Sequence, residues 1–233
     1  SNNNKRMIRS RLFSFGKFKF NEGSKIKSWS QNLLCEKGRV ESDCIYEDGT
    51  EIHTECFIHP ALNIYAVNKT FKKLPQSRKF SYDFVLEGFN GATKELETIR
   101  YIKQENNESV TGFRMYGIDV YTGEVRLCMD VPHSAAAAEN GVHIEFEPSE
   151  GSSAALFYYL EDNLETEDYI SVLADIKKKI DSCGFEGLKQ ECADDYTKFY
   201  ELGYVNTSDS VLNEIYKTAL YNLKCYTTKY SVA

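Results

Sequence analysis

The sequence predicts a mainly β protein, an antiparallel β-sandwich followed by helices. Hydrophobic residues alternate with a period near two from residue 7 to about residue 160, which is typical of half-buried strands. Ten or more short strands with no helical pattern between them indicate an antiparallel sandwich or barrel. After Leu160 the hydrophobic period becomes helical. A chain of 233 residues with 42% hydrophobic content can bury a sizeable core.

The first strands combine aromatic and basic residues. Phe13 and Phe15 share one face, whereas Phe18 and Phe20 have the other parity, so a bulge or tight bend is predicted at Gly16. Basic residues alternate with Leu, Phe or Gly here and are expected on the solvent side, where lysine protects a sheet edge. These basic residues are Arg9, Arg11, Lys17 and Lys19.

The clearest turn signal is the dipeptide Asp48-Gly49, which is typical of a type I′ β-hairpin because both residues tolerate positive φ. A two-residue loop there would place Ile45 opposite Ile52 and Cys44 opposite His53.

The same alternation predicts the remaining strands, and the run Ser134–Ala138 is predicted to be a loop of small residues. The strands are expected at 63–70, 79–86, 99–104, 110–116, around Thr122-Gly123, at 142–146 and at 154–159.

Three helices are expected after the strands. The first has an acidic first turn and a basic last turn and ends at Gly184, and the second ends before Gly203. The third begins at an N-cap cluster, Ser208 to Ser210, and its wide apolar stripe predicts burial inside a helical assembly. The alternative is that this helix packs on the outside of the sandwich.

Charge and cysteine usage exclude several classes of protein. Residues 1–30 carry a net charge of +7, so the remainder carries −14 of the chain's total of −7, and this acidic surface argues against nucleic acid as a partner. No apolar run is long enough to cross a membrane. Seven cysteines without a CxxC pair favour a reduced, cytoplasmic setting, and secretion is expected only if a signal peptide has been removed.

Three stretches carry a resemblance to a known enzyme class. The hairpin from Tyr46 to Pro60 is similar to one reading aromatic, Asp-Gly, then Arg-Glu-x-Phe, with Thr54 in place of the Arg. The segment from Gly184 to Leu188, with Cys192 and Tyr196 in place of a His and a Trp, resembles a helical linker. Ser208 to Tyr226 resembles a first barrel helix. The order of parts resembles the front of six-hairpin (α/α) barrel glycosidases, closest to glycoside hydrolase families sixty-five and ninety-five.

This resemblance implies a super-β-sandwich over residues 1–162, a helical linker over 163–204 and the first helix of a truncated (α/α) barrel over 205–233. It implies a glycoside hydrolase or phosphorylase whose acid and base lie in the missing barrel. The expected partners are the downstream barrel, a carbohydrate substrate and a second copy in a homodimer. No catalytic residue, cofactor or metal ligand is therefore expected within these 233 residues.

The chain offers few alternatives for chemistry of its own. Cys44 beside His53 would pair a thiol with a base, but no third orienting group is evident. The four histidines have no zinc spacing, and neither a Gly-x-Ser-x-Gly motif nor a Gly-rich phosphate loop occurs.

Trp29 is the candidate carbohydrate contact, because an exposed indole can stack on a pyranose ring; the alternative is that it caps the sandwich core. Three functions remain open. They are an accessory domain that supports a barrel, a free-standing carbohydrate-binding module that uses Trp29, and a β-barrel carrier of an apolar ligand with a cavity lined by Phe80, Phe84 and Phe113.

Overall fold

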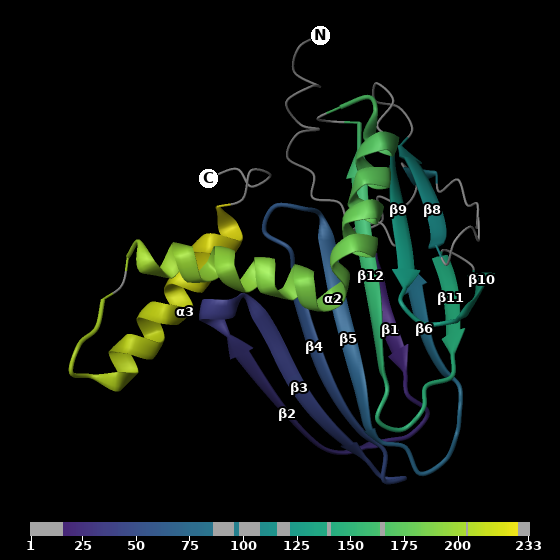
Figure 1. Cartoon of the computed structure of the whole chain (residues 1–233), viewed down its shortest axis with the longest axis horizontal. Coiled ribbons are helices and arrows are strands. Elements are labelled where there is room, and N and C mark those ends of the chain that lie inside the picture. The colour runs from purple at the N-terminus through teal and green to yellow at the C-terminus, as the bar shows by residue number, and fades with distance from the viewer. Residues whose placement is uncertain are drawn as a thin grey trace.

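The computed structural model of the chain describes residues 16–85, 96–97, 108–115, 122–138, 141–163, 166–203 and 205–227. Two antiparallel sheets are stacked face to face, and the longer of the two helices lies on the outer face of the larger sheet (Figure 1). The predicted mainly β fold is therefore confirmed. The predictions for Arg9, Arg11, Phe13, Phe15 and a strand at 99–104 fall outside the described residues.

The larger sheet has eight strands in the order β2-β3-β4-β5-β12-β9-β8-β7. Its strands are β2 (Ile26–Leu34), β3 (Arg39–Tyr46), β4 (Glu51–Ile58), β5 (Ile64–Lys73), β7 (Leu96–Glu97), β8 (Glu108–Met115), β9 (Thr122–Met129) and β12 (Ser153–Asp162). A short 3-10 helix, η1 (Cys35–Lys37), joins β2 to β3.

The smaller sheet has the order β1-β6-β11-β10, with β1 (Lys17–Asn21), β6 (Phe80–Val85), β10 (Ser134–Ala138) and β11 (Gly141–Phe146). The loop predicted at Ser134–Ala138 is wrong, because this run pairs along its length with β11. The small side chains of this run carry no alternating pattern, so they gave no strand signal in the sequence.

The first core lies between the two sheets. Every second residue of β6, β9 and β11 points into it, as the alternation predicted. Phe18 and Phe20 of β1 pack against this core, whereas Lys17 and Lys19 on the same strand are exposed. The prediction that lysines line the solvent side of this edge strand is thus confirmed for these two residues.

The hairpin predicted at Asp48-Gly49 exists, but its loop and register differ from the prediction. The loop has three residues, Glu47 to Gly49, closed by Tyr46 and Thr50, and Gly49 has φ 85°. A loop of three residues with glycine in the left-handed region moves the register by one position. Cys44 therefore lies opposite Ile52.

The long helix α2 (Tyr169–Glu201) covers the outer face of the larger sheet and bends at Gly184, which has φ 60°. The two helices predicted on either side of Gly184 therefore exist as two halves of one bent element. A second core lies between this helix and the sheet, and both halves of α2 contribute to it. The contributing helical residues are Leu173, Ile176, Ile180, Phe185, Leu188, Cys192, Tyr196 and Tyr200.

The last helix, α3 (Ser210–Tyr226), lies beside the C-terminal half of α2, away from the sandwich (Figure 1). It begins as predicted within the cluster Ser208 to Ser210. The Asp209 carboxylate accepts hydrogen bonds from the backbone N–H groups of Val211 (2.9 Å) and Leu212 (3.3 Å), which caps the helix.

Candidate functional site

One side of α3 is fixed to α2. The Tyr200 hydroxyl donates to the Lys217 carbonyl (2.7 Å), and the rings of Tyr196 and Tyr221 stack with their centroids 5.8 Å apart. Lys224 lies 2.6 Å from the Asp195 carboxylate, and its ammonium also lies over the Tyr196 ring. These contacts hold α3 in a defined orientation on α2.

The opposite side of α3 is apolar and exposed. No residue of α3 is buried, and even its large apolar side chains are exposed: Leu212 is 54% exposed and Ile215 is 60% exposed. Large apolar side chains spaced along one helical face are normally covered by a neighbouring element. The residues of this surface, called here the α3 apolar face, are Val211, Leu212, Ile215, Leu223 and Tyr226.

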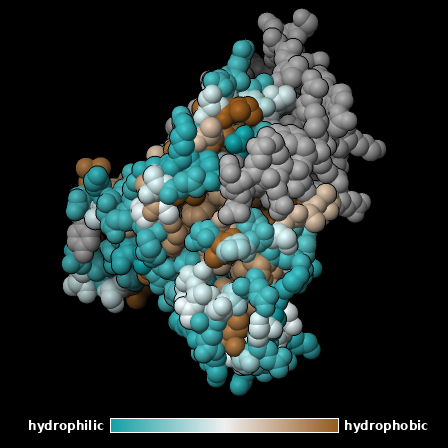
Figure 2. All heavy atoms as spheres, turned by 45° about the vertical axis from the view of Figure 1, so that its right-hand side comes forward, coloured by the Kyte–Doolittle hydropathy of each residue, from teal (hydrophilic) through white to brown (hydrophobic). Residues whose placement is uncertain are grey.

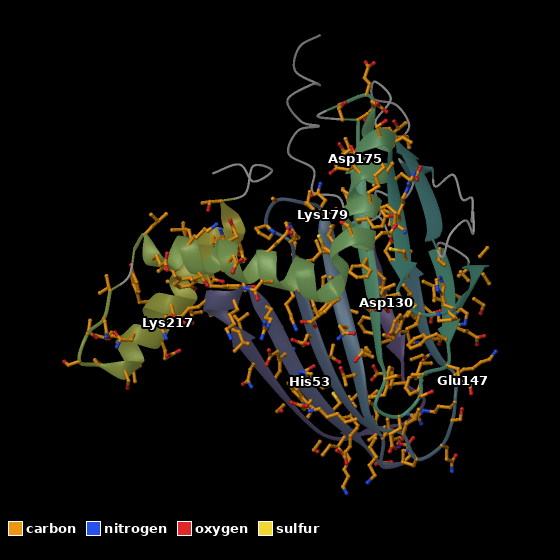
Figure 3. All side chains as sticks on the ribbon, viewed as in Figure 1. His53, Asp130, Glu147, Asp175, Lys179 and Lys217 are labelled. Carbon is orange, nitrogen blue, oxygen red and sulfur yellow. The ribbon has the colours of Figure 1, made fainter. Side chains whose placement is uncertain are left out.

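The segment that leads into α3 is tied to the helix by polar contacts. The Asn213 side-chain oxygen accepts from the Thr207 backbone N–H (2.8 Å), and its amide donates to the Asn206 side chain (3.0 Å) and to the Thr207 carbonyl (2.9 Å). Lys217 of α3, labelled in Figure 3, is tied to η1 by an ion pair. Its ammonium lies 3.5 Å from the Glu36 carboxylate. The α3 apolar face is thus presented on a held element.

Cys192 lies at the junction of α2, η1 and β4 and is not an activated thiol. Its Sγ points to the carbonyl oxygens of Gly38 and Ile58, at 3.7 and 3.8 Å. Burial raises the pKa of this thiol to about 12, so it stays protonated at neutral pH. The position at which the resembled linkers carry a His therefore serves packing in this chain.

His59 connects the turn after β4 to α2. Its Nδ1 accepts from the backbone N–H groups of Ala61 and Leu62, both at 3.2 Å, so the other ring nitrogen carries the proton of the neutral ring. That Nε2 lies 3.4 Å from a Glu191 oxygen, without hydrogen-bond geometry. Burial lowers the pKa of His59. The ring is a neutral structural link between turn and helix.

Cys44 and His53 do not form the thiol and base considered from the sequence. His53 lies opposite Asp43, with its Nδ1 3.0 Å from the carboxylate, while Cys44 points to the other face of the sheet. A hydrogen bond from Lys72 to Asp43 (2.7 Å) lowers the pKa of that carboxyl, and burial raises the pKa of the Cys44 thiol. Asp43, His53 and Lys72 thus form an ion-pair cluster on this face of the larger sheet, and Figure 3 labels His53.

His143 forms a separate cluster on the smaller sheet. Its Nδ1 lies 2.6 Å from Asp83, and its Nε2 lies 3.7 Å from Glu145, which also pairs with Lys79 at 3.1 Å. The hydrogen bond to Asp83 raises the pKa of His143. Within the described ranges, no group of three or more His, Cys, Asp or Glu side chains could hold a metal ion.

Trp29 lies on β2, the outermost strand of the larger sheet, and its side chain is 65% exposed. Trp29 stands opposite Cys44, so its side chain is on the same face of the sheet as the sandwich core. Because most of the indole is exposed, the alternative in which Trp29 caps that core is wrong.

Phe80 and Phe84, which a carrier protein would need as cavity walls, are packed against other rings. Phe80 lies 5.0 Å from Phe71 between ring centroids, and Phe84 lies 5.1 Å from Phe18 and 5.3 Å from Tyr158. The Phe113 side chain lies outside the described residues. The described core therefore gives the carrier hypothesis no support.

On the face of the sandwich in Figure 2, hydrophobic residues form small patches between hydrophilic ones, which is usual for a protein surface. Among the residues described, no helix is long and apolar enough to cross a bilayer.

Two stacked antiparallel sheets with a bent helix on the outer face of the larger one define a sandwich domain, and comparison with solved structures gives the same class. The chain is similar to a protein described as "Putative kojibiose phosphorylase from human microbiome", with a TM-score of 0.71 and 12% identity. The match covers 91% of this chain and 31% of that chain, so this chain spans about a third of its structural relative. No protein-family model and no curated protein matches the sequence.

Proposed function

We propose that this chain is a non-catalytic N-terminal domain of a larger carbohydrate-active enzyme, a glycoside hydrolase or glycoside phosphorylase. In this proposal residues 1–162 form the sandwich, 163–204 the helical linker and 205–233 the first helix of the catalytic (α/α) barrel. The observation that carries the proposal is the α3 apolar face, exposed on a helix that is otherwise firmly held. The match to one part of a longer phosphorylase supports it.

The barrel would cover the α3 apolar face and use α2 and η1 as a fixed support. Burying several large apolar side chains contributes roughly 1.5–3 kcal/mol each, which is enough to hold two parts of a chain together. The sandwich then serves the reaction by positioning the barrel. In this proposal the ion-pair clusters around His53 and His143 link neighbouring strands and have no catalytic role.

Hydrogen exchange tests the barrel contact. In this 233-residue chain, the exposed side of α3 leaves the helix stabilised on one face only, so its amides should exchange faster than those of α2. In a longer protein that includes the residues after Ala233, α3 should become as protected as α2. Equal exchange of α3 in both proteins would remove the barrel contact from the proposal.

A variant sharpens the same test in the longer protein. Ile215→Asp puts a charge on the α3 apolar face and should reduce glycoside turnover at least tenfold, because it would bury an unpaired carboxylate against the barrel. Lys198→Asp, on an exposed position of α2, is the matched control and should leave turnover unchanged. The 233-residue chain alone should show no turnover with glycosides, with or without inorganic phosphate.

A second function is favoured by one observation, the exposed indole of Trp29. In this alternative the chain is a carbohydrate-binding module that stacks a sugar ring on Trp29. Trp29 is the only tryptophan of the chain, so its fluorescence reports directly on such a contact. Titration with kojibiose or glucose should give a saturable change in emission, with glycerol as the control. An unchanged spectrum at millimolar sugar would exclude this role.

A further inference from the structure

The smaller sheet covers only part of the inner face of the larger sheet. β1, at one end of the smaller sheet, lies over β5 and β12, because the Phe18 ring centroid is 6.1 Å from that of Tyr65 and 5.4 Å from that of Tyr158. β2, β3 and β4 extend beyond β1 (Figure 1). On the inner face of these three strands, Trp29 is 65% exposed and Ile58 is 67% exposed. This part of the sheet face is therefore open to solvent.

A row of polar side chains crosses the open part of this face. Gln31 on β2 lies opposite Ser42, Ser42 lies opposite Thr54, and Thr54 lies opposite Lys69 on β5. Directly opposite residues share a face of a sheet, and Lys69 has the parity of the β5 residues in the first core. Exposure falls along the row: Gln31 is exposed, Ser42 and Thr54 are half-buried, and Lys69 is buried.

The buried end of this polar row is an ion pair. Lys69 pairs with Glu22, which follows β1, and the two side chains are 7% and 12% exposed. The Lys69 ammonium also lies 4.6 Å from the centroid of the Phe20 ring. The row therefore carries no net charge. Among the described residues, the side chains of Gln31, Ser42 and Thr54 have no hydrogen-bond partner, so their amide and hydroxyl groups are available to a ligand.

Apolar side chains flank the polar row on both sides. Trp29 lies opposite Cys44 on one side of it. On the other side, Leu33 lies opposite Val40, and Val40 lies opposite Cys56. The open face thus presents an apolar, a polar and a second apolar strip, each running across the strands. Such a combination of apolar surface with a few placed polar groups is typical of a binding site.

We infer that an extended, neutral oligosaccharide binds across β2, β3 and β4 along this polar row. Its hydroxyls meet Gln31, Ser42 and Thr54, its terminal unit reaches the Lys69–Glu22 pair, and the apolar faces of its rings contact the flanking strips. Adjacent strands lie about 4.8 Å apart, so the row crosses roughly 14 Å from β2 to β5, enough for several sugar units. The inference rests on the carbohydrate role proposed above and extends it from a single ring on Trp29 to a chain of rings.

Other occupants fit this face less well. A purely apolar partner would bury the free polar groups of Gln31, Ser42 and Thr54 without hydrogen bonds, which is costly. A charged polymer would find the Lys69 ammonium already paired with Glu22. A neutral sugar chain carries both hydroxyls and apolar ring faces, so it matches the polar row and the strips beside it.

Calorimetric titration of the chain tests the length of the site. The probes are maltose and maltotetraose for α-linked glucose, and cellobiose and cellotetraose for β-linked glucose. In at least one series the affinity should rise roughly tenfold from the disaccharide to the tetrasaccharide, because two further rings add contacts to a preformed face. Equal affinities within both series would leave only a short site at Trp29 and overturn the inference. Absence of binding by all four sugars at millimolar concentration overturns it as well.

A matched pair of serine variants tests the position of the site. Ser42→Ala removes one hydroxyl from the polar row and should weaken tetrasaccharide binding about fivefold, which corresponds to one lost hydrogen bond. Ser30→Ala makes the same change on the other face of the sheet, opposite Asp43, and should leave the affinity unchanged. Equal affinities of the two variants would overturn the inference. Hydrogen exchange of α3 does not involve this face, so failure here would leave the barrel contact standing.

Discussion

The two helices α2 and α3 are neighbours with opposite surroundings. α2 buries eight residues against the sheet, η1 and α3, whereas α3 buries none. Both have apolar stripes, capping carboxylates and basic last turns, so their local sequences are equally suited to a helix. The difference lies in the partner: the sheet supplies one for α2, and the described chain supplies α3 with a partner on one side only.

The largest expected effect on stability comes from truncating a buried side chain between α2 and the larger sheet. Leu188 is fully buried in the core between α2 and the larger sheet. Leu188→Ala should lower the free energy of unfolding by about 2–5 kcal/mol, because a cavity is added to the lost burial. Urea unfolding followed by circular dichroism measures this change. A loss below 1 kcal/mol would contradict the conclusion that α2 is fully packed against the larger sheet.

The next largest effect on stability is expected at the contact between the end of η1 and α2. Gly38 follows η1 with φ 62°, and a Cβ there would overlap the Tyr196 ring of α2. Gly38→Ala should lower the free energy of unfolding by about 1–3 kcal/mol, from backbone strain and displacement of Tyr196. Gly151→Ala is the matched control, with φ 77° and no atom near the added Cβ, so it keeps the backbone strain alone. Equal losses in the two variants would contradict the contact.

The link through His59 predicts a dependence of stability on pH. Because burial lowers the pKa of His59 in the folded chain, the unfolded chain takes up its proton first. Stability from this residue is present above the ordinary pKa of 6.5 and is lost as pH falls below it. His59→Asn should flatten the decline in urea midpoint between pH 7 and pH 5.

His143 gives the opposite sign and serves as the control for that series. Asp83 raises the pKa of His143, so its stabilisation is present below 6.5 and is lost as pH rises through the raised value. His143→Asn should therefore change the slope above pH 6.5. The two roles would be reversed if the decline in urea midpoint between pH 7 and pH 5 were flattened in His143→Asn and unchanged in His59→Asn.

The smallest effect is expected on α3. Leu212→Ala makes the same chemical change as Leu188→Ala on a side chain that is 54% exposed, and should alter the free energy of unfolding of this chain by less than about 0.5 kcal/mol. The same substitution in a longer protein that contains the proposed barrel should cost more. A large loss in the present chain would show that α3 is already covered.

Alternation of side chains predicted most of the sandwich. Val125, Leu127 and Met129 are buried on β9 as their spacing predicted, because one face of that strand meets the core. β2 was not recognised, since its polar residues gave no half-buried pattern at a sheet edge where neither face is covered. β10 was missed because its alanines are alike on both faces.

The register of the hairpin after β3 shows a second limit of sequence reasoning. Asp48-Gly49 correctly indicated a turn, but the dipeptide is compatible with two-residue and three-residue loops. One additional loop residue exchanged the faces of all following side chains, so Cys44 and His53 were separated. The position of Trp29 on an exposed edge likewise follows from the sheet order, which no local pattern contains.

The bend at Gly184 has a consequence for how this architecture can change. A Cβ at this position would meet no atom within 4 Å, so only the backbone, with φ 60° and ψ −172°, restricts the residue to glycine. The direction in which the second half of α2 carries α3 away from the sandwich is therefore encoded by a single pair of dihedral angles. A substitution there would strain the bend and disturb the packing of Phe185 and Leu188, which follow it, against the larger sheet.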